Sequence, residues 1–144
     1  MIIGILLAAG SGSRFGGDKL LHPLSDGTPV GVASLRHLQA ALPDVIAVVR
    51  SADKRLGQLL GKEGANVVLC EDAGQGMARS LVCAIGASRD AHGWVIALGD
   101  MPFLQARTIG MIAERLAQTD RIVIPAYRGE RGHPVGFGRI YRDE

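Results

Sequence analysis

The sequence has few aromatic residues and no large excess of charge of one sign. Aromatic side chains make up 4% of the 144 residues, which is too few for a surface that stacks successive bases of a single-stranded nucleic acid. There are 16 basic and 14 acidic residues, so the net charge is only +2, and no long run of either sign occurs. We therefore expect no nucleic-acid partner.

Long apolar runs are also absent, so we expect no membrane partner and a cytoplasmic location. The apolar start lacks a basic leader and is followed at once by glycines, which argues against a secretion signal. Cysteine is scarce, since only Cys70 and Cys83 occur, and they are too far apart for a zinc motif. We expect both to be small buried side chains in a reducing compartment.

Glycine is abundant near the start of the chain. Residues 2–7 form a nearly continuous apolar run, which is typical of a strand buried on both faces of a parallel sheet. Four glycines follow it: Gly10, Gly12, Gly16 and Gly17. So many glycines do not suit the interior of a helix or strand, but their bare N–H groups can surround an anion. Arg14 and Lys19 add positive charge, so the stretch indicates a loop that binds a nucleoside triphosphate; the alternative is that both are solvated loop charges.

This loop matches neither of the two common phosphate-binding signatures. The dinucleotide fingerprint needs a third glycine at the place that Phe15 occupies. The Walker A loop needs lysine and then a hydroxyl residue directly after its second glycine, whereas Asp18 follows the glycine here and Leu20 follows the lysine. The sequence therefore indicates a third kind of phosphate loop.

The rest of the chain alternates predicted strands and helices. The strands are expected at 45–49, 66–70, 94–98 and 121–125, and the helices at 30–42, 53–60, 77–88 and 105–118. This alternation favours one α/β domain, residues 1–144, with a mostly parallel sheet and right-handed crossovers. Because ligands of such sheets bind beyond the carboxyl ends of the strands, we expect the site where the first loop, the 71–76 loop and Asp100 meet.

Asp100 directly follows a predicted buried strand. A carboxylate there is well placed to hold Mg²⁺ against phosphate oxygens, because this cation prefers oxygen ligands and shares them with substrate. From position alone, the alternative is a cap for the following helix. His133 stands between Gly132 and Pro134, and from position alone it is equally well a turn histidine.

Three motifs in order resemble the MobA-like nucleotidyltransferases. They are residues 7–21 (LAAGSGSRFGGDKLL), residues 99–103 (GDMPF) and residues 131–137 (RGHPVGF). The chain is most similar to the molybdenum cofactor cytidylyltransferase (MocA-type) branch. The resemblance implies a three-layer, Rossmann-like sandwich of the nucleotide-diphospho-sugar transferase type.

The resemblance also implies roles for particular residues. Those expected at the nucleotide are Leu7, Ala8, Ala9, Gly10, Gly12, Arg14, Lys19, Gly76 and Ser80. Residues 7–10 would use main-chain groups, Lys19 would contact the phosphates, and Arg14 would stabilise the leaving pyrophosphate. Asp100 would bind the metal and His133 would contact the acceptor, which makes Arg14, Lys19 and Asp100 the expected catalytic set. For Gly76 and Ser80 an ordinary helix start stays open.

The expected substrates are CTP and the phosphate of molybdopterin. Guanylyl-transferring members of the family have glycine at the place of Ala9, and the extra methyl favours the smaller pyrimidine over GTP. The expected reaction is attack of the acceptor phosphate on the α-phosphorus of CTP with Mg²⁺ present, which releases pyrophosphate. The alternatives are a guanylyltransferase, a sugar- or polyol-phosphate cytidylyltransferase, or a non-catalytic nucleotide-binding or cofactor-handling accessory protein.

The chain stops earlier than the resemblance implies. Family members continue by roughly a helix and a strand, which end in a second carboxylate for the metal, whereas this chain ends at Glu144. We therefore expect weaker metal binding by Asp100 alone and low or no turnover. We also expect an exposed sheet edge that invites self-association or pairing with a molybdoenzyme or accessory partner.

Overall fold

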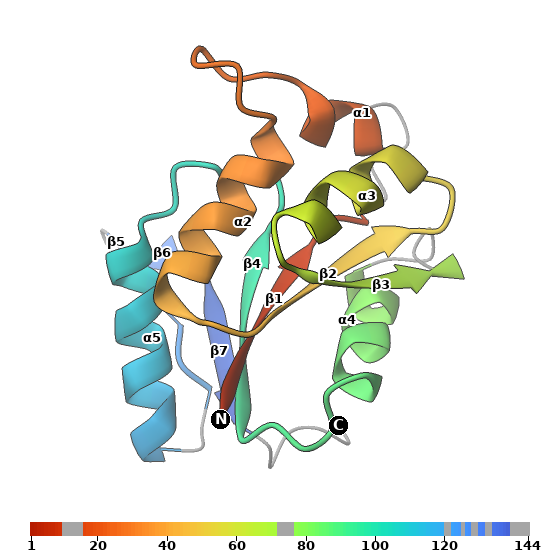
Figure 1. Cartoon of the computed structure of the whole chain (residues 1–144). Helices are drawn as coiled ribbons and strands as arrows, with labels where there is room; N and C mark the ends of the chain where they lie inside the picture. Colours follow the sequence, from red (N-terminus) through yellow and green to blue (C-terminus); the bar gives the residue numbers. More distant parts are fainter. Residues whose placement is uncertain are drawn as a thin grey trace.

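The computed structural model describes residues 1–9, 16–71, 77–119, 122–124, 126–127, 130–131 and 134–138. Its elements in chain order are β1 (Ile2–Leu7), α1 (Gly16–Leu21), α2 (Val30–Ala41), β2 (Val45–Arg50), α3 (Lys54–Lys62), β3 (Asn66–Cys70), α4 (Met77–Gly86), β4 (Gly93–Leu98), α5 (Ala106–Thr119), β5 (Ala126–Tyr127), β6 (Glu130–Arg131) and β7 (Val135–Gly138). Figure 1 shows a central sheet with helices on both sides.

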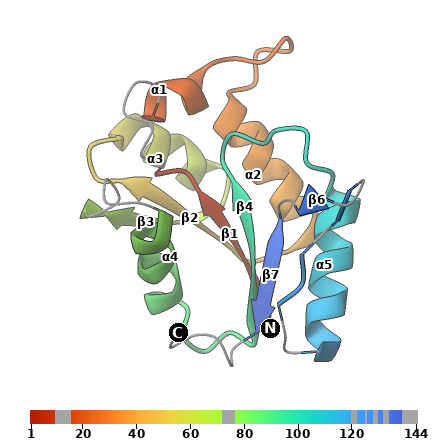
Figure 2. The ribbon, with the colours of Figure 1, turned by 180° about the vertical axis from the view of Figure 1, so that it is seen from behind.

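The central sheet has the strand order β3-β2-β1-β4-β7. The first four strands run parallel to one another, and β7 runs antiparallel to β4. Helices α2, α3 and α5 cover one face and α4 covers the other, as Figure 1 and the view from behind in Figure 2 show. The predicted three-layer, mostly parallel α/β architecture is confirmed.

Register brings the carboxyl ends of the inner strands together. Leu7, the last residue of β1, pairs with Leu98, the last residue of β4, and also with Val48 of β2. The segments that leave β1 and β4 therefore start side by side. This is the edge at which ligands of open parallel sheets bind.

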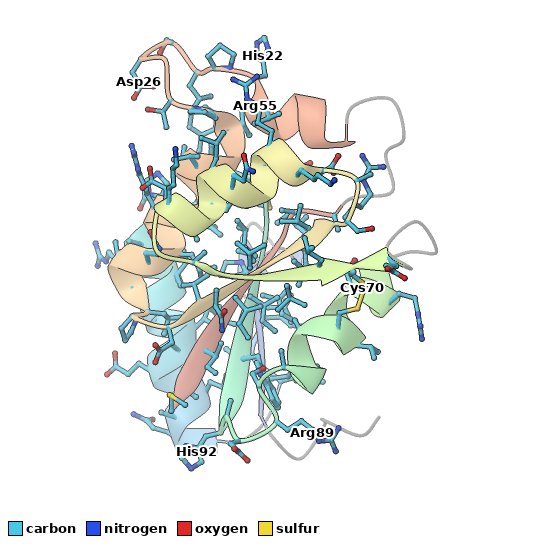
Figure 3. The ribbon with its side chains drawn as sticks, turned by 45° about the vertical axis from the view of Figure 1, so that its right-hand side comes forward. His22, Asp26, Arg55, Cys70, Arg89 and His92 are labelled. Carbon is cyan, nitrogen blue, oxygen red and sulfur yellow. A yellow bond between two sulfur atoms is a disulfide. The ribbon has the colours of Figure 1, made fainter. Side chains whose placement is uncertain are left out.

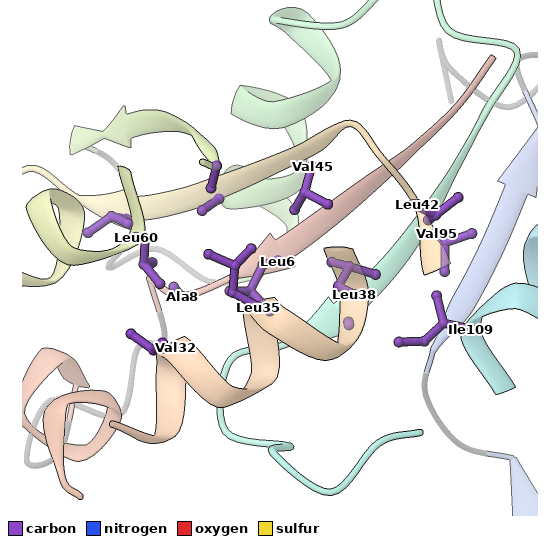
Figure 4. Packing of buried hydrophobic residues seen from close by; sticks show 14 of the residues in the cluster. Leu6, Ala8, Val32, Leu35, Leu38, Leu42, Val45, Leu60, Val95 and Ile109 are labelled. Atoms are coloured by element: carbon purple, nitrogen blue, oxygen red, sulfur yellow. The ribbon is translucent and has the colours of Figure 1, made fainter. Parts of the chain in front are cut away.

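The core explains why the β1 run is apolar throughout. Alternate residues of a strand point to opposite faces, so Leu6 and Ala8 join the cluster under α2, α3 and α5. Ile5 and Leu7 join a second cluster with Ala84 of α4. Figure 4 shows side chains of α2 directed at Leu6 and Ala8. A strand that is covered on both faces has no place for the polar half of an alternating pattern.

Most predicted elements are present, but the first loop ends earlier than expected. The structure has a short helix, α1, over residues that were predicted to belong to the glycine loop, so Lys19 lies on a helix. Gly16 and Gly17 stand at the start of this helix rather than in its interior, where glycine is costly. Leu20, buried to 5% exposure, holds the helix against α2, because Gly31 of α2 has no Cβ to keep it away.

The carboxyl-terminal part of the sheet also differs from the prediction. The predicted strand 121–125 is reduced to an isolated bridge between Val123 and Gly136, and Arg121 and Pro125 lie outside the described residues. On the side of β4 that faces away from β1, the neighbouring strand is β7, which was not predicted. Its VGFG sequence is short and has glycine at alternate positions, so it lacks the usual strand pattern. Val123 exchanges two hydrogen bonds with Gly136, so the outer edge of β7 is partly paired.

The prediction that both cysteines are reduced is wrong for this structure, which joins Cys70 and Cys83 in a disulfide (Figure 3). The two residues are 13 positions apart in sequence, but β3 and α4 fold back on each other and bring their Cα atoms to 6.3 Å. That distance lies within the range that a disulfide spans. Sequence spacing alone does not reveal this approach.

Among the described residues, no helix combines the length and apolar character needed to cross a membrane.

Gly93→Ala tests the packing of β4 beneath α5. A Cβ at this position would lie 2.9 Å from Leu116 Cδ2 and 3.1 Å from the Phe137 carbonyl oxygen, and the main-chain oxygen cannot move aside cheaply. We expect a loss of about 1–3 kcal/mol in the free energy of unfolding, measured by urea denaturation. Gly110→Ala is the control, because its Cβ meets nothing within 4 Å and helix propensity should add about 0.5–1 kcal/mol. Equal effects of both variants would contradict the packing described here.

The disulfide closes a loop between residues 13 apart, which by loop-closure entropy stabilises the fold by about 3 kcal/mol. We expect dithiothreitol to lower the melting temperature of the wild type to the level of Cys83→Ser. The same reductant should leave Cys83→Ser unchanged, since this variant has no bond to break. An unchanged wild-type melting temperature, together with two free thiols before reduction, would show that the bond does not form.

Candidate active site

The candidate site lies at the carboxyl edge of the sheet, the upper edge in Figure 1, where α1 is also found. Asp100 stands two residues past the end of β4, and Ala9 stands two residues past the end of β1. Because Leu7 and Leu98 are in register, both segments leave the sheet at the same height. Sequence reasoning predicted this convergence.

Lys19 and Asp100 form the polar centre of this edge. Lys19 Nζ lies 3.4 Å from Asp100 Oδ2, although the two residues are 81 positions apart in sequence. Their side chains are 53% and 44% exposed, so solvent and ligands reach both. An exposed ion pair contributes little to folding, so neither side chain is needed to hold the fold together.

The turn that carries Asp100 is tightly fixed. The Gly99 N–H donates to the Leu7 carbonyl oxygen at 3.0 Å, and the Met101 N–H donates to the Leu98 carbonyl oxygen at 3.2 Å. A Cβ on Gly99 would come within 3.2 Å of the same Leu7 oxygen and within 3.0 Å of Leu20 Cδ1. A side chain at position 99 would therefore force its neighbours to shift by a few tenths of an ångström, and the carboxylate begins from a main chain held by two hydrogen bonds.

Sequence reasoning missed Ser34 on α2. This side chain is 4% exposed, and its Oγ lies 2.7 Å from the Gly99 carbonyl oxygen. The available signal was its spacing, since Gly31, Ser34 and Leu38 recur on the buried face of the predicted helix, where a hydroxyl is out of place.

The apolar residues after β1 are largely used by the fold itself. Leu7 accepts the hydrogen bond from Gly99, and the Ala8 N–H donates to the Val48 carbonyl oxygen at 2.9 Å. Ala9 is 3% exposed and belongs to the core cluster on the α4 side of the sheet. Its methyl therefore packs in the core of this structure, so the base preference argued from that methyl needs a direct test.

The remaining predicted site residues are less informative. Gly10, Gly12, Arg14, Gly76 and His133 lie outside the described residues. Ser80 is on α4 and only 3% exposed, and its hydroxyl has no hydrogen-bond partner among the described residues. The roles predicted for these six residues stay predictions.

A divalent cation fits the donor chemistry of this edge. Asp100 offers carboxylate oxygens, and within the described ranges no three histidine, cysteine or acidic side chains gather into a metal cage. Mg²⁺ typically keeps several waters and binds through one or two carboxylates together with substrate phosphates, which is what a single exposed carboxylate allows. Asp100 would hold such an ion together with a phosphate-bearing ligand.

A groove of about 400 Å³ lies at the opposite edge of the sheet. It is bordered by residues 43–46 and 87–91, with Gly64 and Asn66. Figure 3 shows Arg89 and His92 at this lower edge and His22 near α1 at the upper edge. None of the predicted site residues in the described ranges lines the groove. We therefore place the candidate chemistry at Asp100.

The sheet order and the mostly parallel strands define a Rossmann-like α/β protein. Residues 4–144 match the model of the MobA-like NTP transferase domain. The chain belongs to this family, as the sequence motifs indicated.

Relatives of known sequence and structure agree with this assignment. The chain is 30% identical over 146 residues to the bifunctional protein GlmU of Symbiobacterium thermophilum, covering 99% of this chain and 30% of that protein. It is 31% identical to Rv0371c of Mycobacterium tuberculosis, with a TM-score of 0.84, covering 99% of this chain and 73% of that one. A manganese complex of Rv0371c matches with 30% identity, a TM-score of 0.81 and the same coverage. A nucleotidyl transferase of a Methanothermobacter species (Mth528) matches with 25% identity and a TM-score of 0.83, over 99% of this chain and 74% of that one.

The chain spans about a third of the length of the curated relatives that it matches. The likeness therefore concerns only part of those proteins.

The exposed Lys19–Asp100 pair predicts a small effect on folding. We expect Lys19→Ala and Asp100→Ala each to change the free energy of unfolding by less than about 1 kcal/mol, because exposed ion pairs are well solvated when separated. Gly99→Ala in the same turn should cost about 1–3 kcal/mol, because its Cβ meets main chain. Urea denaturation of the three variants measures this, and a large loss for Lys19→Ala would mean that the pair is structural.

Proposed function

We propose that the protein is a nucleotidyltransferase that moves a nucleoside monophosphate from a triphosphate to a phosphate-bearing acceptor. One observation carries the proposal: Lys19 Nζ lies 3.4 Å from Asp100 Oδ2 at the carboxyl edge of the sheet. A cation and an oxygen donor, both exposed and side by side, suit a triphosphate with its metal ion. Membership of the MobA-like NTP transferase domain family supports the same reaction class.

The side chains have separate tasks in this reaction. Lys19 binds phosphate oxygens and neutralises part of their charge as the bond to the leaving pyrophosphate breaks. Arg14, through its place in the motif of residues 7–21, stabilises that pyrophosphate. Asp100 holds a divalent cation, which when bound supplies further neutralisation of the triphosphate. The acceptor phosphate is already a nucleophile near neutral pH, so no side chain is needed as a base.

The proposed substrates are CTP and molybdopterin, with Mg²⁺ as the metal. The resemblance of residues 7–21 to the molybdenum cofactor cytidylyltransferases supports this choice. The manganese complex of Rv0371c supports a divalent cation in a relative of this fold. We also propose a cytoplasmic location, because the sequence has no long apolar run. The Cys70–Cys83 disulfide is then an exception among proteins of a reducing compartment.

The reaction is tested by pyrophosphate release with each of the four nucleoside triphosphates, Mg²⁺ and a molybdopterin source. We expect slow release with CTP, in keeping with metal binding by Asp100 alone, and a further loss of about 100-fold or more for Asp100→Asn, since that variant keeps the shape but loses the negative oxygen donor. Asp44→Asn is the matched control, because Asp44 is an exposed carboxylate at the opposite edge.

Other results separate the alternatives. Release with GTP would support a guanylyltransferase. Release with CTP only when sugar or polyol phosphates are supplied would support a sugar- or polyol-phosphate cytidylyltransferase. Triphosphate binding by calorimetry without release, with any acceptor, would support a non-catalytic accessory protein. Equal activity of Asp100→Asn and the wild type would contradict the site itself.

A further inference from the structure

Ser34 is a buried hydroxyl whose contacts reach outside its own helix. Its Oγ lies 3.0 Å from the Val30 carbonyl oxygen, one turn earlier in α2, and 2.7 Å from the Gly99 carbonyl oxygen. A hydroxyl has one proton, so it donates fully to one carbonyl at a time. The contact with Gly99 has the usual distance of a good O–H···O bond, and both groups are shielded from water.

The Gly99 carbonyl belongs to the peptide group that joins Gly99 to Asp100. The Gly99 N–H is bonded on its other side to Leu7 of β1 at 3.0 Å. Gly99 is therefore held from two directions, by β1 through its N–H and by α2 through its C=O. Rotation of the Gly99–Asp100 peptide, which would re-aim the carboxylate, breaks the bond to Ser34.

The same helix also positions Lys19. Leu20 packs on α2 at Gly31, where an added Cβ would meet Leu20 Cβ at 3.2 Å and the Leu20 carbonyl oxygen at 3.3 Å. Gly31 and Ser34 are three residues apart, so they lie on the same face of α2. One turn of α2 therefore contacts both the turn that carries Asp100 and the helix that carries Lys19.

We propose that Ser34 is a positioning residue for the active site: its hydroxyl fixes the Gly99–Asp100 peptide so that the Asp100 carboxylate faces Lys19. This inference rests on the proposed function for its catalytic consequence, but its structural part stands apart from any reaction. Ser34 does not touch substrate and acts through Asp100. Partners that hydrogen-bond a metal-binding side chain directly change metal affinity by about 10- to 100-fold when they are removed, and Ser34 acts one peptide group away, so we expect the lower end of that range.

Ser34→Ala is the test, with the affinity for Mn²⁺ and CTP as the main readout. Electron paramagnetic resonance titration of Mn²⁺ in the presence of CTP should show a loss of about tenfold in affinity. The kcat for pyrophosphate release should fall with it, while the KM for the acceptor stays unchanged. Ser34→Thr keeps the hydroxyl and should restore Mn²⁺ affinity to within about threefold of the wild type, which a role in filling space alone does not predict.

Ser88→Ala is a matched control for the loss of a buried serine. Ser88 is 9% exposed, donates to the Ala84 carbonyl oxygen at 2.8 Å and accepts from Trp94 Nε1 at 2.9 Å. It precedes β4 and so lies at the opposite edge of the sheet. We expect both alanine variants to lower the melting temperature, but only Ser34→Ala to lower Mn²⁺ affinity. Equal Mn²⁺ losses in the two variants would overturn the proposal.

A readout without ligand separates this inference from the proposed function. If the wild type binds no Mn²⁺ with any triphosphate, the proposed function fails, and the structure of ligand-free Ser34→Ala then decides the role of Ser34. We expect its Asp100 carboxylate to move away from Lys19 and its Asp100 amide resonance to shift, because that amide shares a peptide group with the Gly99 carbonyl. An unmoved carboxylate and an unshifted resonance would show that Ser34 does not position Asp100.

Discussion

The close approach of main chain to main chain at Gly99 is the constraint on which the candidate site depends. The Gly99 N–H bonds to the last residue of β1, and a Cβ at this position would lie unusually close to the Leu7 oxygen, at 3.2 Å, and to Leu20 of α1, at 3.0 Å. The turn after β4 therefore meets β1 and α1, which lie far earlier in the sequence. A larger residue at this position would separate them, and with them the cation and the carboxylate at their ends.

Helix α2 is the support beneath this meeting point. Its apolar residues Val32, Leu35 and Leu38 pack on β1 in the larger core cluster, which fixes the axis of the helix relative to the sheet. On the same buried side, Gly31 admits α1 and Ser34 bonds to the Gly99 carbonyl oxygen. One face of α2 therefore has two roles. Its hydrophobic contacts fix the position of the helix on the sheet, and its two small residues contact the segments that carry Lys19 and Asp100.

Sequence patterns predicted the parts of this molecule that depend on burial of whole faces. The strands that become β1, β2, β3 and β4 read correctly because apolar runs of that length and composition suit a sheet covered on both sides. Sequence patterns gave the wrong prediction where one tertiary contact outweighs the local conformational preference of the residues. Helix α1 forms over two glycines because Leu20 is buried, and β7 forms from a glycine-rich stretch because Gly136 lets Ile112 approach to a distance that a Cβ would block.

The candidate site likewise combines features that the sequence patterns predicted with contacts that they did not predict. The convergence of the ends of β1 and β4 at one edge was predictable, because the carboxyl ends of parallel strands share that edge. The sequence predicted that Lys19 and Asp100 lie at the same edge, but not that they are in contact. The distance between them depends on the packing of α1. Ser34 and the Cys70–Cys83 bond were not predicted at all. The spacing of Ser34 places it on the buried face of its helix but does not identify its partner, and the spacing of the cysteines does not reveal their approach.

The disulfide bears on the predicted nucleotide contacts through the geometry of α4. Cys70 ends β3 at the carboxyl edge of the sheet, and Cys83 lies on α4, so the bond anchors this helix to the edge where the site lies. Ser80 precedes Cys83 by three residues and so lies on the same side of the helix. Rotation of α4 that would carry Ser80 away from the sheet must also carry Cys83 away from Cys70, which the covalent bond prevents. The disulfide thus adds to the apolar packing of Ala84 and Ile85 in holding the side of α4 that carries the buried Ser80 hydroxyl.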